Sequence, residues 1–329
     1  MKKSPRPATA ADVAARAGVS RATVSHILNG REGRFPEETR NRVRMAAEEL
    51  DYRPSPAGRS LVTGRSDMIV VVMPETTIGQ NLQNALEYLS DDAAGLGSNV
   101  VLRFAGPDPE KTATALVRLR PLAVVDFGSL DRPARGRLAA QGVPVVPDLD
   151  GSRPRGSRGP HDEIGELQVA ALTERGDRQI VYASISDRRT DPYGPGRYAG
   201  IEAACRRRGL AVPLSVPVPT RLASATAVLR ELPRHGPLGV AAYNDEVALA
   251  VLAAAAQSGL TVPDDLAVVG VDATDVGQLW APPLTTIEVD MQAFVGTVVD
   301  ELAAALGREA PPGGGKEKRM LRLVPGGTT

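Results

Sequence analysis

Between Asp67 and Val271 the sequence alternates short apolar runs with longer segments of helical periodicity. This alternation limits the possible folds of the chain more than any other feature. The apolar runs have the length and the β-branched content of buried strands. Strands that alternate with helices at this spacing form parallel, doubly wound sheets, which bind ligands outside the carboxyl ends of their strands. We therefore predict an α/β body with a binding site at its strand ends.

A stretch rich in Gly, Pro and Arg, residues 151–160, divides the alternation into two series. The first series predicts strands 68–73, 100–104, 122–127 and 143–146, with helices near 80–94, 109–119 and 132–141. The second predicts strands 179–183, 214–218, 239–242 and 266–271, with helices 163–174, 197–208, 223–232 and 245–258. Two such units predict two lobes with a cleft between them.

The first 50 residues have a different pattern, in which apolar residues recur at helical spacing in three short segments. Three helices are predicted, over 10–17, over 21–28 and from Pro36 in the first turn of the third. Thr9 can cap the first helix, Gly18 can end it, and Ser20 can cap the second. Two short helices joined by a Gly-containing turn, with a third across them, describe a helix-turn-helix. An ordinary three-helix bundle with a solvated polar face fits the same pattern.

The second of these helices carries the side chains expected of a DNA-reading element. An α-helix fits the width of a major groove. The outward face of this one has Arg21, Ala22, Thr23, Ser25 and His26. Arg21 and His26 can bond to base edges, and Ala22 can contact a thymine methyl group. The two hydroxyl side chains can reach phosphates.

The formal net charge of zero conceals an uneven distribution. Residues 1–65 contain 13 Lys and Arg against 7 Asp and Glu, a net charge of +6. The remaining 26 basic and 32 acidic residues give −6. A basic N-terminal part on an acidic body predicts that only the N-terminal part meets a polyanion.

The N-terminal sequence resembles the lactose-repressor (LacI/GalR) family of bacterial transcription regulators. The resemblance rests on TAADVA at 9–14, AGVS at 17–20, TVSHILNG at 23–30 and AAEELDY at 46–52. It implies that Arg21 and Ala22 open a recognition helix and read operator bases together with His26. Many members have Arg at the position of His26, so operator preference should shift. Thr9, Ser20 and Asn29 complete the predicted DNA-binding residues of this module.

Residues 54–66 are predicted to be a hinge, with prolines first and glycine late. The family resemblance implies a short helix over Pro56–Thr63 that pairs with its dimer mate in the minor groove. Leu61 falls at the position of the leucine that wedges open a base step, at a cost that bent DNA offsets by extra contact. Gly58 replaces the usual Ala and weakens this helix by about 0.5–1 kcal/mol. We expect the hinge to be helical only on the operator.

The resemblance continues more loosely through the body, for example in VPDDLAVVGVD at 262–272 and PPLTTI at 282–287. It implies the fold of the periplasmic sugar-binding proteins, whose chain crosses three times between lobes. The predicted domains are a helix-turn-helix at 1–53, the hinge at 54–66 and the two-lobed body at 67–329. Lobe 1 is predicted at 67–161 and 290–319, and lobe 2 at 162–289 and 320–329. The helix at 292–306 would thus return to lobe 1 and residues 321–324 to lobe 2.

Three polar residues stand at predicted strand ends where a ligand would lie. Arg197 can fork onto hydroxyls or a carboxylate, Asn244 offers a donor and an acceptor, and Asp272 can accept two hydroxyl protons. Family members use the matching positions for effector binding, and Trp280 could line the cleft. Asp245 and Asp272 could instead cap the helix or turn after each strand. A carbohydrate is the effector class that the family suggests, although residues 75–81 lack the aromatic side chains of a sugar platform.

Two other classes of protein share parts of this pattern. An exported solute-binding protein would need a secretory signal and has no use for a helix-turn-helix. An enzyme is disfavoured because three His, one Cys, no P-loop and no nucleophile elbow make no recognisable catalytic set. We expect no cofactor and no metal, a cytoplasmic location without membrane association, and a homodimer rather than a tetramer. The predicted partners are a double-stranded DNA operator and a small-molecule effector.

Overall fold

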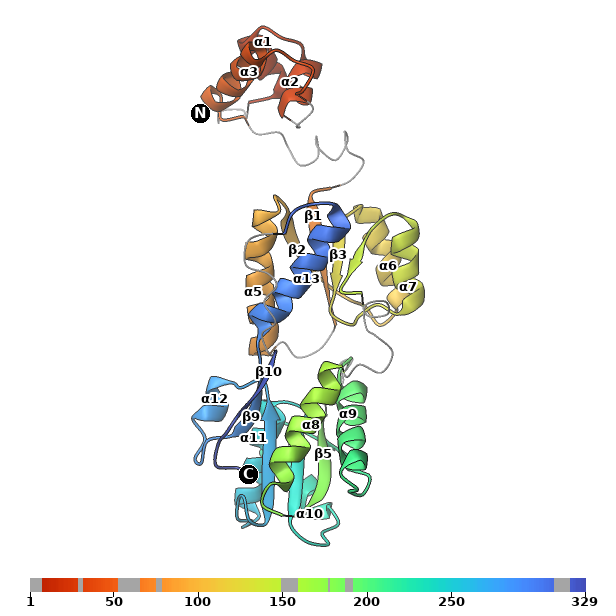
Figure 1. The fold of residues 1–329 in the computed structure, drawn as a ribbon, viewed down its shortest axis with the longest axis vertical. Coiled ribbons are helices and arrows are strands. Elements are labelled where there is room, and N and C mark those ends of the chain that lie inside the picture. Colours follow the sequence, from red (N-terminus) through yellow and green to blue (C-terminus); the bar gives the residue numbers. More distant parts are fainter. Residues whose placement is uncertain are drawn as a thin grey trace, which may run out of the picture. The chain divides into compact units, whose positions relative to one another are not determined.

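The computed structural model describes residues 8–28, 32–52, 66–74, 79–148, 159–176, 178–186, 192–310 and 320–329. The chain forms two compact units. One consists of residues 1–67 together with Leu119–Leu122, and the other of Met68–Arg118 with Ala123–Thr329. We call residues 8–52 the head and the second unit the body, and describe each by itself (Figure 1).

The head consists of α1 (Ala10–Ala17), α2 (Arg21–Leu28) and α3 (Glu37–Glu49), so the first two helices have the predicted bounds. Gly18 ends α1 in the left-handed conformation, with φ of 66°. Pro36 precedes α3 as its N-cap, so the third helix begins one residue later than predicted. One small apolar core holds the three helices together and contains Val13, Ala14, Ala17, Val24, Ile27, Val43, Ala46 and Ala47.

The first sheet of the body is parallel and has the strand order β2-β1-β3-β4. Its strands are β1 (Met68–Met73), β2 (Asn99–Phe104), β3 (Ala123–Asp126) and β4 (Val145–Val146). Side chains of β1 alternate between two cores. Ile69, Val71 and Met73 pack with α5 (Gln80–Gly95) and α13 (Met291–Leu306). Val70 and Val72 pack with α6 (Pro109–Leu119) and α7 (Arg132–Ala140) on the other face (Figure 1).

The second sheet has the strand order β10-β9-β8-β7-β5-β6. Its strands are β5 (Gln179–Ile185), β6 (Leu214–Val218), β7 (Leu238–Ala242), β8 (Leu266–Val271), β9 (Thr285–Val289) and β10 (Leu321–Val324). Its helices are α8 (Pro160–Thr173), α9 (Gly194–Arg207), α10 (Leu222–Glu231), α11 (Asp245–Gln257) and the short α12 (Asp275–Gln278). One large core joins them.

Two features of the second sheet differ from the prediction. The sheet is not wholly parallel, because β10 runs antiparallel to β9. The strand alternation could not show this, since α13 of the first sheet separates β9 from β10 along the chain. Helix α9 begins at Gly194 rather than Arg197, because Pro195 in its first turn has the backbone angle that a helix start requires. Arg197 therefore lies one turn inside the helix.

Helices α8 and α9 approach each other at two glycines. A Cβ atom built on Gly200 would lie 2.1 Å from the carbonyl oxygen of His161, and one on Gly165 would lie 2.4 Å from the carbonyl carbon of Gly200. Only residues without a side chain allow the two backbones to come this close. The contact fixes α9, and with it Arg197, against the rest of the second sheet.

Candidate nucleic-acid interface and ligand site

Helix α2 is capped at its first turn by Ser20. The backbone N–H of Thr23 donates to Ser20 Oγ over 3.0 Å, and the two hydroxyl oxygens lie 2.9 Å apart. Val24 and Ile27 are buried at 1% and 3% exposure, and so anchor one face of the helix. Arg21 and Ala22 are exposed, while His26 is half-buried. The helix thus presents its first residues to solvent from a fixed core.

The remaining predicted DNA-binding residues are distributed around the helix ends. Thr9 forms a capping box, in which its backbone N–H donates to Asp12 Oδ2 over 2.8 Å and the Asp12 N–H donates back to Thr9 Oγ1 over 3.4 Å. Thr23 and Ser25 are half-buried on α2. Asn29 and Leu61 lie outside the described residues, as does the predicted hinge helix Pro56–Thr63.

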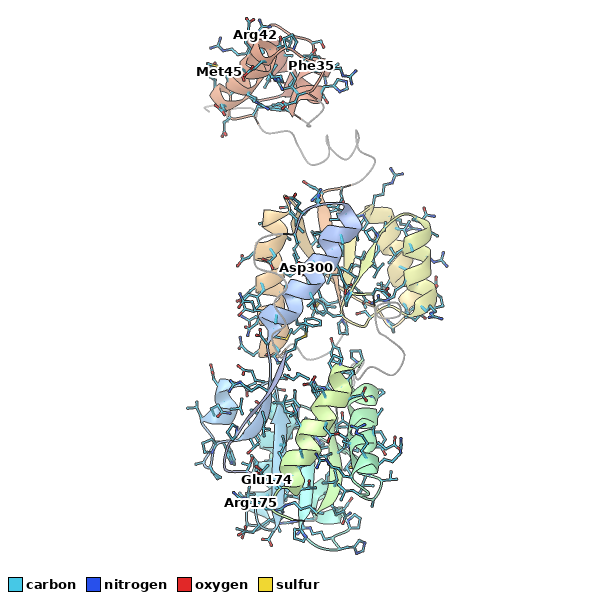
Figure 2. The ribbon with its side chains drawn as sticks, in the orientation of Figure 1. Phe35, Arg42, Met45, Glu174, Arg175 and Asp300 are labelled. Atoms are coloured by element: carbon cyan, nitrogen blue, oxygen red, sulfur yellow. The ribbon has the colours of Figure 1, made fainter. Side chains whose placement is uncertain are left out.

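The segment between α2 and α3 carries an aromatic residue that sequence reasoning missed. The ring of Phe35, labelled in Figure 2, lies 6.2 Å from that of His26 at an interplanar angle of 36°. The guanidinium of Arg34 lies 6.0 Å from the centre of the same ring. Phe35 also packs against the core of the head. The segment therefore touches α2 at a residue predicted to read bases.

In the body, Asp272 follows β8 with a backbone φ of 108°, a region that residues with a side chain rarely adopt. Its carboxylate Oδ1 accepts a 2.9 Å hydrogen bond from Nδ2 of Asn81 on α5, which lies against the first sheet. Burial raises the pKa of Asp272 to about 6, against the opposing effect of the Arg197 guanidinium. An uncommon backbone and a raised pKa are features that cluster at functional sites.

Arg197 is held by the residue before Asn244. It donates from Nη1 to the carbonyl oxygen of Tyr243, and its guanidinium lies 4.5 Å from the centre of the Tyr243 ring. Its Nε is buried and has no hydrogen-bond partner among the described residues. This N–H is a donor that a ligand could satisfy. Arg197 also lies close enough to Asp272 for its positive charge to oppose the rise in the Asp272 pKa.

Asn244 caps α11, since its Oδ1 accepts a 3.0 Å hydrogen bond from the N–H of Val247. The adjacent Asp245 does not cap α11 but holds other elements in place. It is 1% exposed and accepts hydrogen bonds from the N–H of Thr274 at 2.7 Å and from the Thr286 hydroxyl at 2.5 Å. These bonds tie the segment after β8 to α11, and burial raises the pKa of Asp245.

Trp280 follows α12 and packs, partly buried, against the core of the second sheet. Its neighbours Leu279 and Val276 are 83% and 63% exposed. The structure thus places Trp280 beside an exposed apolar surface of the second sheet's helices.

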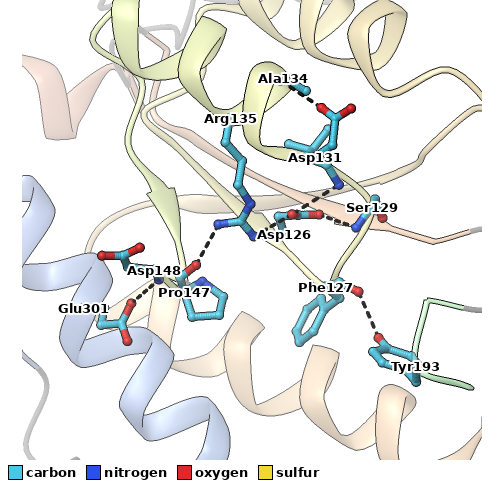
Figure 3. A network of polar contacts seen from close by, with 11 residues as sticks. Asp126, Phe127, Ser129, Asp131, Ala134, Arg135, Pro147, Asp148, Tyr193 and Glu301 are labelled. Carbon is cyan, nitrogen blue, oxygen red and sulfur yellow. Dashed lines mark hydrogen bonds and ion pairs between the residues drawn. The ribbon is translucent and has the colours of Figure 1, made fainter. Parts of the chain in front are cut away.

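A buried ion pair supports the segment after β3. Arg135 Nη2 lies 2.6 Å from Asp126 Oδ2, and Arg135 also donates to the carbonyl oxygen of Pro147 (Figure 3). Burial raises the pKa of Asp126, although Arg135 opposes the shift. The same segment contains Phe127, whose carbonyl oxygen accepts a 3.0 Å hydrogen bond from the hydroxyl of Tyr193. Tyr193 and the pair of Asn81 with Asp272 therefore connect the first sheet's elements to the second's at two points.

Comparisons with known proteins agree with this arrangement. The family described as "Bacterial regulatory proteins, lacI family" matches residues 9–55, and a "Periplasmic binding protein-like domain" matches residues 169–329. The transcriptional repressor PurR of Klebsiella pneumoniae is 30% identical over 295 residues, which cover 85% of each chain. The chain belongs to the LacI family. Another relative, the repressor CytR of Escherichia coli K12, is 30% identical over 304 residues. These cover 87% of this chain and 86% of CytR.

Solved structures of LacI-family proteins share the fold. The Lac repressor dimer bound to operator and the anti-inducer ONPF has a TM-score of 0.75 at 25% identity, over 98% of this chain and 99% of that one. The regulator CelR in complex with cellobiose has a TM-score of 0.62 at 25% identity, over 98% and 100%. These likenesses confirm the predicted family and fold class.

Membership of the LacI family settles the general class of function. Its members are transcription regulators with a DNA-binding helix-turn-helix and an effector-binding domain, rather than enzymes. Among the described residues, no group of three metal-binding side chains comes together. None of the helices in the described ranges is long and apolar enough to cross a membrane.

Proposed function

We propose that this protein is a cytoplasmic repressor that binds a pseudo-palindromic operator as a homodimer and responds to a small-molecule effector. The head would be residues 1–53, the hinge 54–66 and the two-lobed body 67–329. The observation that carries the proposal is the exposure of Arg21 and Ala22 at the start of a helix whose other face is anchored in a core. A recognition helix needs this combination, because its base-reading side chains must enter the groove while the helix keeps its register.

Base readout is assigned to Arg21, Ala22 and His26. The other predicted residues near the helix ends would contact the sugar-phosphate backbone of DNA and so position the module. They are Thr9, Ser20, Thr23, Ser25 and Asn29. Leu61 in the hinge would wedge a central base step. The Lys and Arg residues of this part would make binding strongly salt-dependent.

Dimer formation is supported by exposed apolar side chains on the body. Val276 and Leu279 near α12 are 63% and 83% exposed, and Leu102 and Phe104 on the edge strand β2 are 42% and 50% exposed. Large apolar side chains left exposed at such sites are candidates for contacts between subunits. The related Lac repressor is a dimer on its operator. Sedimentation of the Leu279→Lys variant should show monomers at concentrations where the wild-type protein is a dimer.

The effector would bind at Arg197, Asn244 and Asp272, with Trp280 nearby. A carboxylate that accepts hydroxyl protons and a forked guanidinium suit a polyhydroxylated ligand, so carbohydrates are the first class to test. CelR, a structural relative, was solved with cellobiose. A sugar of this kind should raise the unfolding temperature of the wild-type protein and should have less effect on the Arg197→Ala variant.

Operator selection from a random duplex library tests the central proposal. The wild-type protein should enrich a two-fold symmetric sequence with two half-sites, and fluorescence anisotropy should show preference for it over random competitor DNA. The Arg21→Ala variant should show a reduced preference and keep salt-dependent non-specific binding. The absence of any enriched sequence, with and without candidate sugars, would contradict the proposal.

A further inference from the structure

His26 is half-buried near the end of α2, and because its side chain is short, its contact with DNA depends on the orientation of the ring. An imidazole ring offers one donor and one acceptor in its neutral form, at fixed angles. The second side-chain torsion of His is broad, so the ring has no strong preference for one orientation by itself. A neighbour that restricts the ring would decide which base edge His26 can read.

Phe35 is such a neighbour. Its ring centre lies 6.2 Å from that of His26, within the range of attractive aromatic pairs, and the two planes are tilted by 36°. Phe35 is itself held on two sides, because it packs against the core of the head and because Arg34 lies over its ring at 6.0 Å. The aromatic ring is thus a supported surface rather than a loose side chain.

The segment that carries Phe35 is anchored to α3. The N–H of Phe35 donates to the carbonyl oxygen of Glu32 over 2.9 Å. Both carboxylate oxygens of Glu32 accept from Nη2 of Arg44 on α3, at 2.8 and 2.7 Å. Arg40 lies 3.9 Å from the same carboxylate. These contacts transmit the position of α3 to Phe35, and through Phe35 to the outward face of α2.

We propose that Phe35 is a positioning residue for base recognition, which holds the imidazole of His26 in the orientation that selects its base pair. The inference rests on the proposed function, because it requires His26 to read a base. It adds a specificity-determining residue that does not itself need to touch DNA. Replacing the aromatic ring should therefore change which sequences are preferred more than how tightly DNA in general is held.

The test compares base preferences across every position of a selected half-site for five proteins. These are the wild type, Phe35→Leu, Phe35→Tyr, His26→Ala and the double variant His26→Ala with Phe35→Leu. Phe35→Leu should lower discrimination about 2- to 10-fold at one base pair, the one whose discrimination His26→Ala abolishes. Phe35→Tyr should restore it, because the ring remains. In the His26→Ala background Phe35→Leu should have no further effect on preference.

Controls separate positioning from stability. Met45→Ala removes a side chain that is 60% exposed on α3, and it should leave the preferences unchanged. Thermal unfolding of each variant shows whether the head is folded at the assay temperature. If Phe35→Leu unfolds it, Phe35→Met, whose unbranched side chain adapts better to the space of the ring, takes its place in the comparison.

The outcomes test separately whether Phe35 positions His26 and whether His26 reads a base. If Phe35→Leu weakens all duplexes equally, or alters preference as much without His26 as with it, the positioning role is wrong. If His26→Ala leaves every base preference intact, the assignment of His26 to base readout fails instead. Loss of preference at a single shared base pair, rescued by Tyr, supports the inference.

Discussion

The head and the body present their predicted binding residues in opposite ways. On the head, Arg21 and Ala22 are exposed on a helix that a buried face anchors. In the body, Asp272 accepts a hydrogen bond from Asn81, Arg197 donates to Tyr243, and Asn244 caps α11. A DNA duplex can meet the first set as it stands. A small ligand at the second set could meet the unpartnered Nε of Arg197 directly but would have to displace the other protein partners, so binding there would be coupled to rearrangement.

The two sets of residues also differ in the free energy that they cost the folded protein. The raised pKa of Asp272 shows that its ionised form is destabilised in the folded body. A ligand that donates hydrogen bonds to the ionised carboxylate would offset this cost. The exposed side chains of α2 carry no comparable cost, and their contribution appears only in the complex with DNA.

The largest effect is expected from Gly200→Ala, which would disturb the support of Arg197 in the body and leave the head untouched. The new Cβ atom would lie 2.1 Å from a backbone oxygen of α8, so the two helices must separate. We expect a loss of about 3 kcal/mol in the unfolding free energy, measured by urea denaturation. Gly136→Ala in α7 is the matched control, since its Cβ meets nothing within 4 Å and Ala favours a helix. Equal stability of the two variants would show that the α8–α9 contact is not tight.

A smaller effect of opposite sign is expected from Asp272→Asn. The folded-state pKa of Asp272 is about 6, above the usual 3.8, so wild-type stability falls as pH rises from about 4 to about 6. The Asn variant lacks this slope and should be about 2–3 kcal/mol more stable at pH 7.5, with no difference below pH 4. The fluorescence of the single tryptophan reports unfolding of the body. A stability difference that does not vary with pH would contradict the raised pKa of this carboxylate.

Arg21→Ala tests the other side of the comparison. We expect about tenfold weaker operator binding, or about 1.4 kcal/mol, with unchanged stability, because the side chain is exposed in the free protein. Anisotropy titrations on operator and on random duplex would measure the two affinities. An equal loss of affinity on both duplexes would mark Arg21 as a phosphate contact. A loss of stability would show that the Arg21 side chain is not free on the face of α2 before DNA binds.

The smallest effects are expected from the two helix caps, one in each region. Ser20→Ala removes the 3.0 Å bond to Thr23, and Asn244→Ala removes the 3.0 Å bond to Val247. Each should cost about 1 kcal/mol of unfolding free energy in calorimetry. Ser20→Ala should also weaken DNA binding, and Asn244→Ala should weaken the response to sugar. If each variant affects both activities alike, the two regions are not separable in the way that the comparison requires.

Much of this molecule could be predicted from local patterns. The bounds of α1 and α2 agreed with the structure because a capping hydroxyl, apolar spacing and Gly18 all act within a few residues of each other. The alternation of strands and helices predicted the two sheets because each element is marked by the periodicity of its own residues. Arg197 and Asp272 were picked out because strand ends of parallel sheets converge. Each of these signals lies within one element or follows from the order of elements.

The residues that were missed depend on contacts between different secondary-structure elements, whether these lie near or far along the chain. Asn81 reaches Asp272 across 191 positions, and Arg135 pairs with Asp126 only because α7 folds back over β3. Phe35 acquires its position beside His26 from packing in the head core. No local pattern marks such side chains, because an isolated Asn, Arg or Phe is common in any sequence.

The amino-acid order by itself determined the family, the helix-turn-helix, the α/β class and the candidate side chains, because periodicity, caps and motif spacing act over short distances. The contacts of the folded chain set which partners those side chains have and make β10 join its sheet antiparallel. They also set how far the pKa of Asp272 lies above its usual value. Partner choice and burial are set by elements that are far apart in the chain, and their effect appears only when the chain has folded.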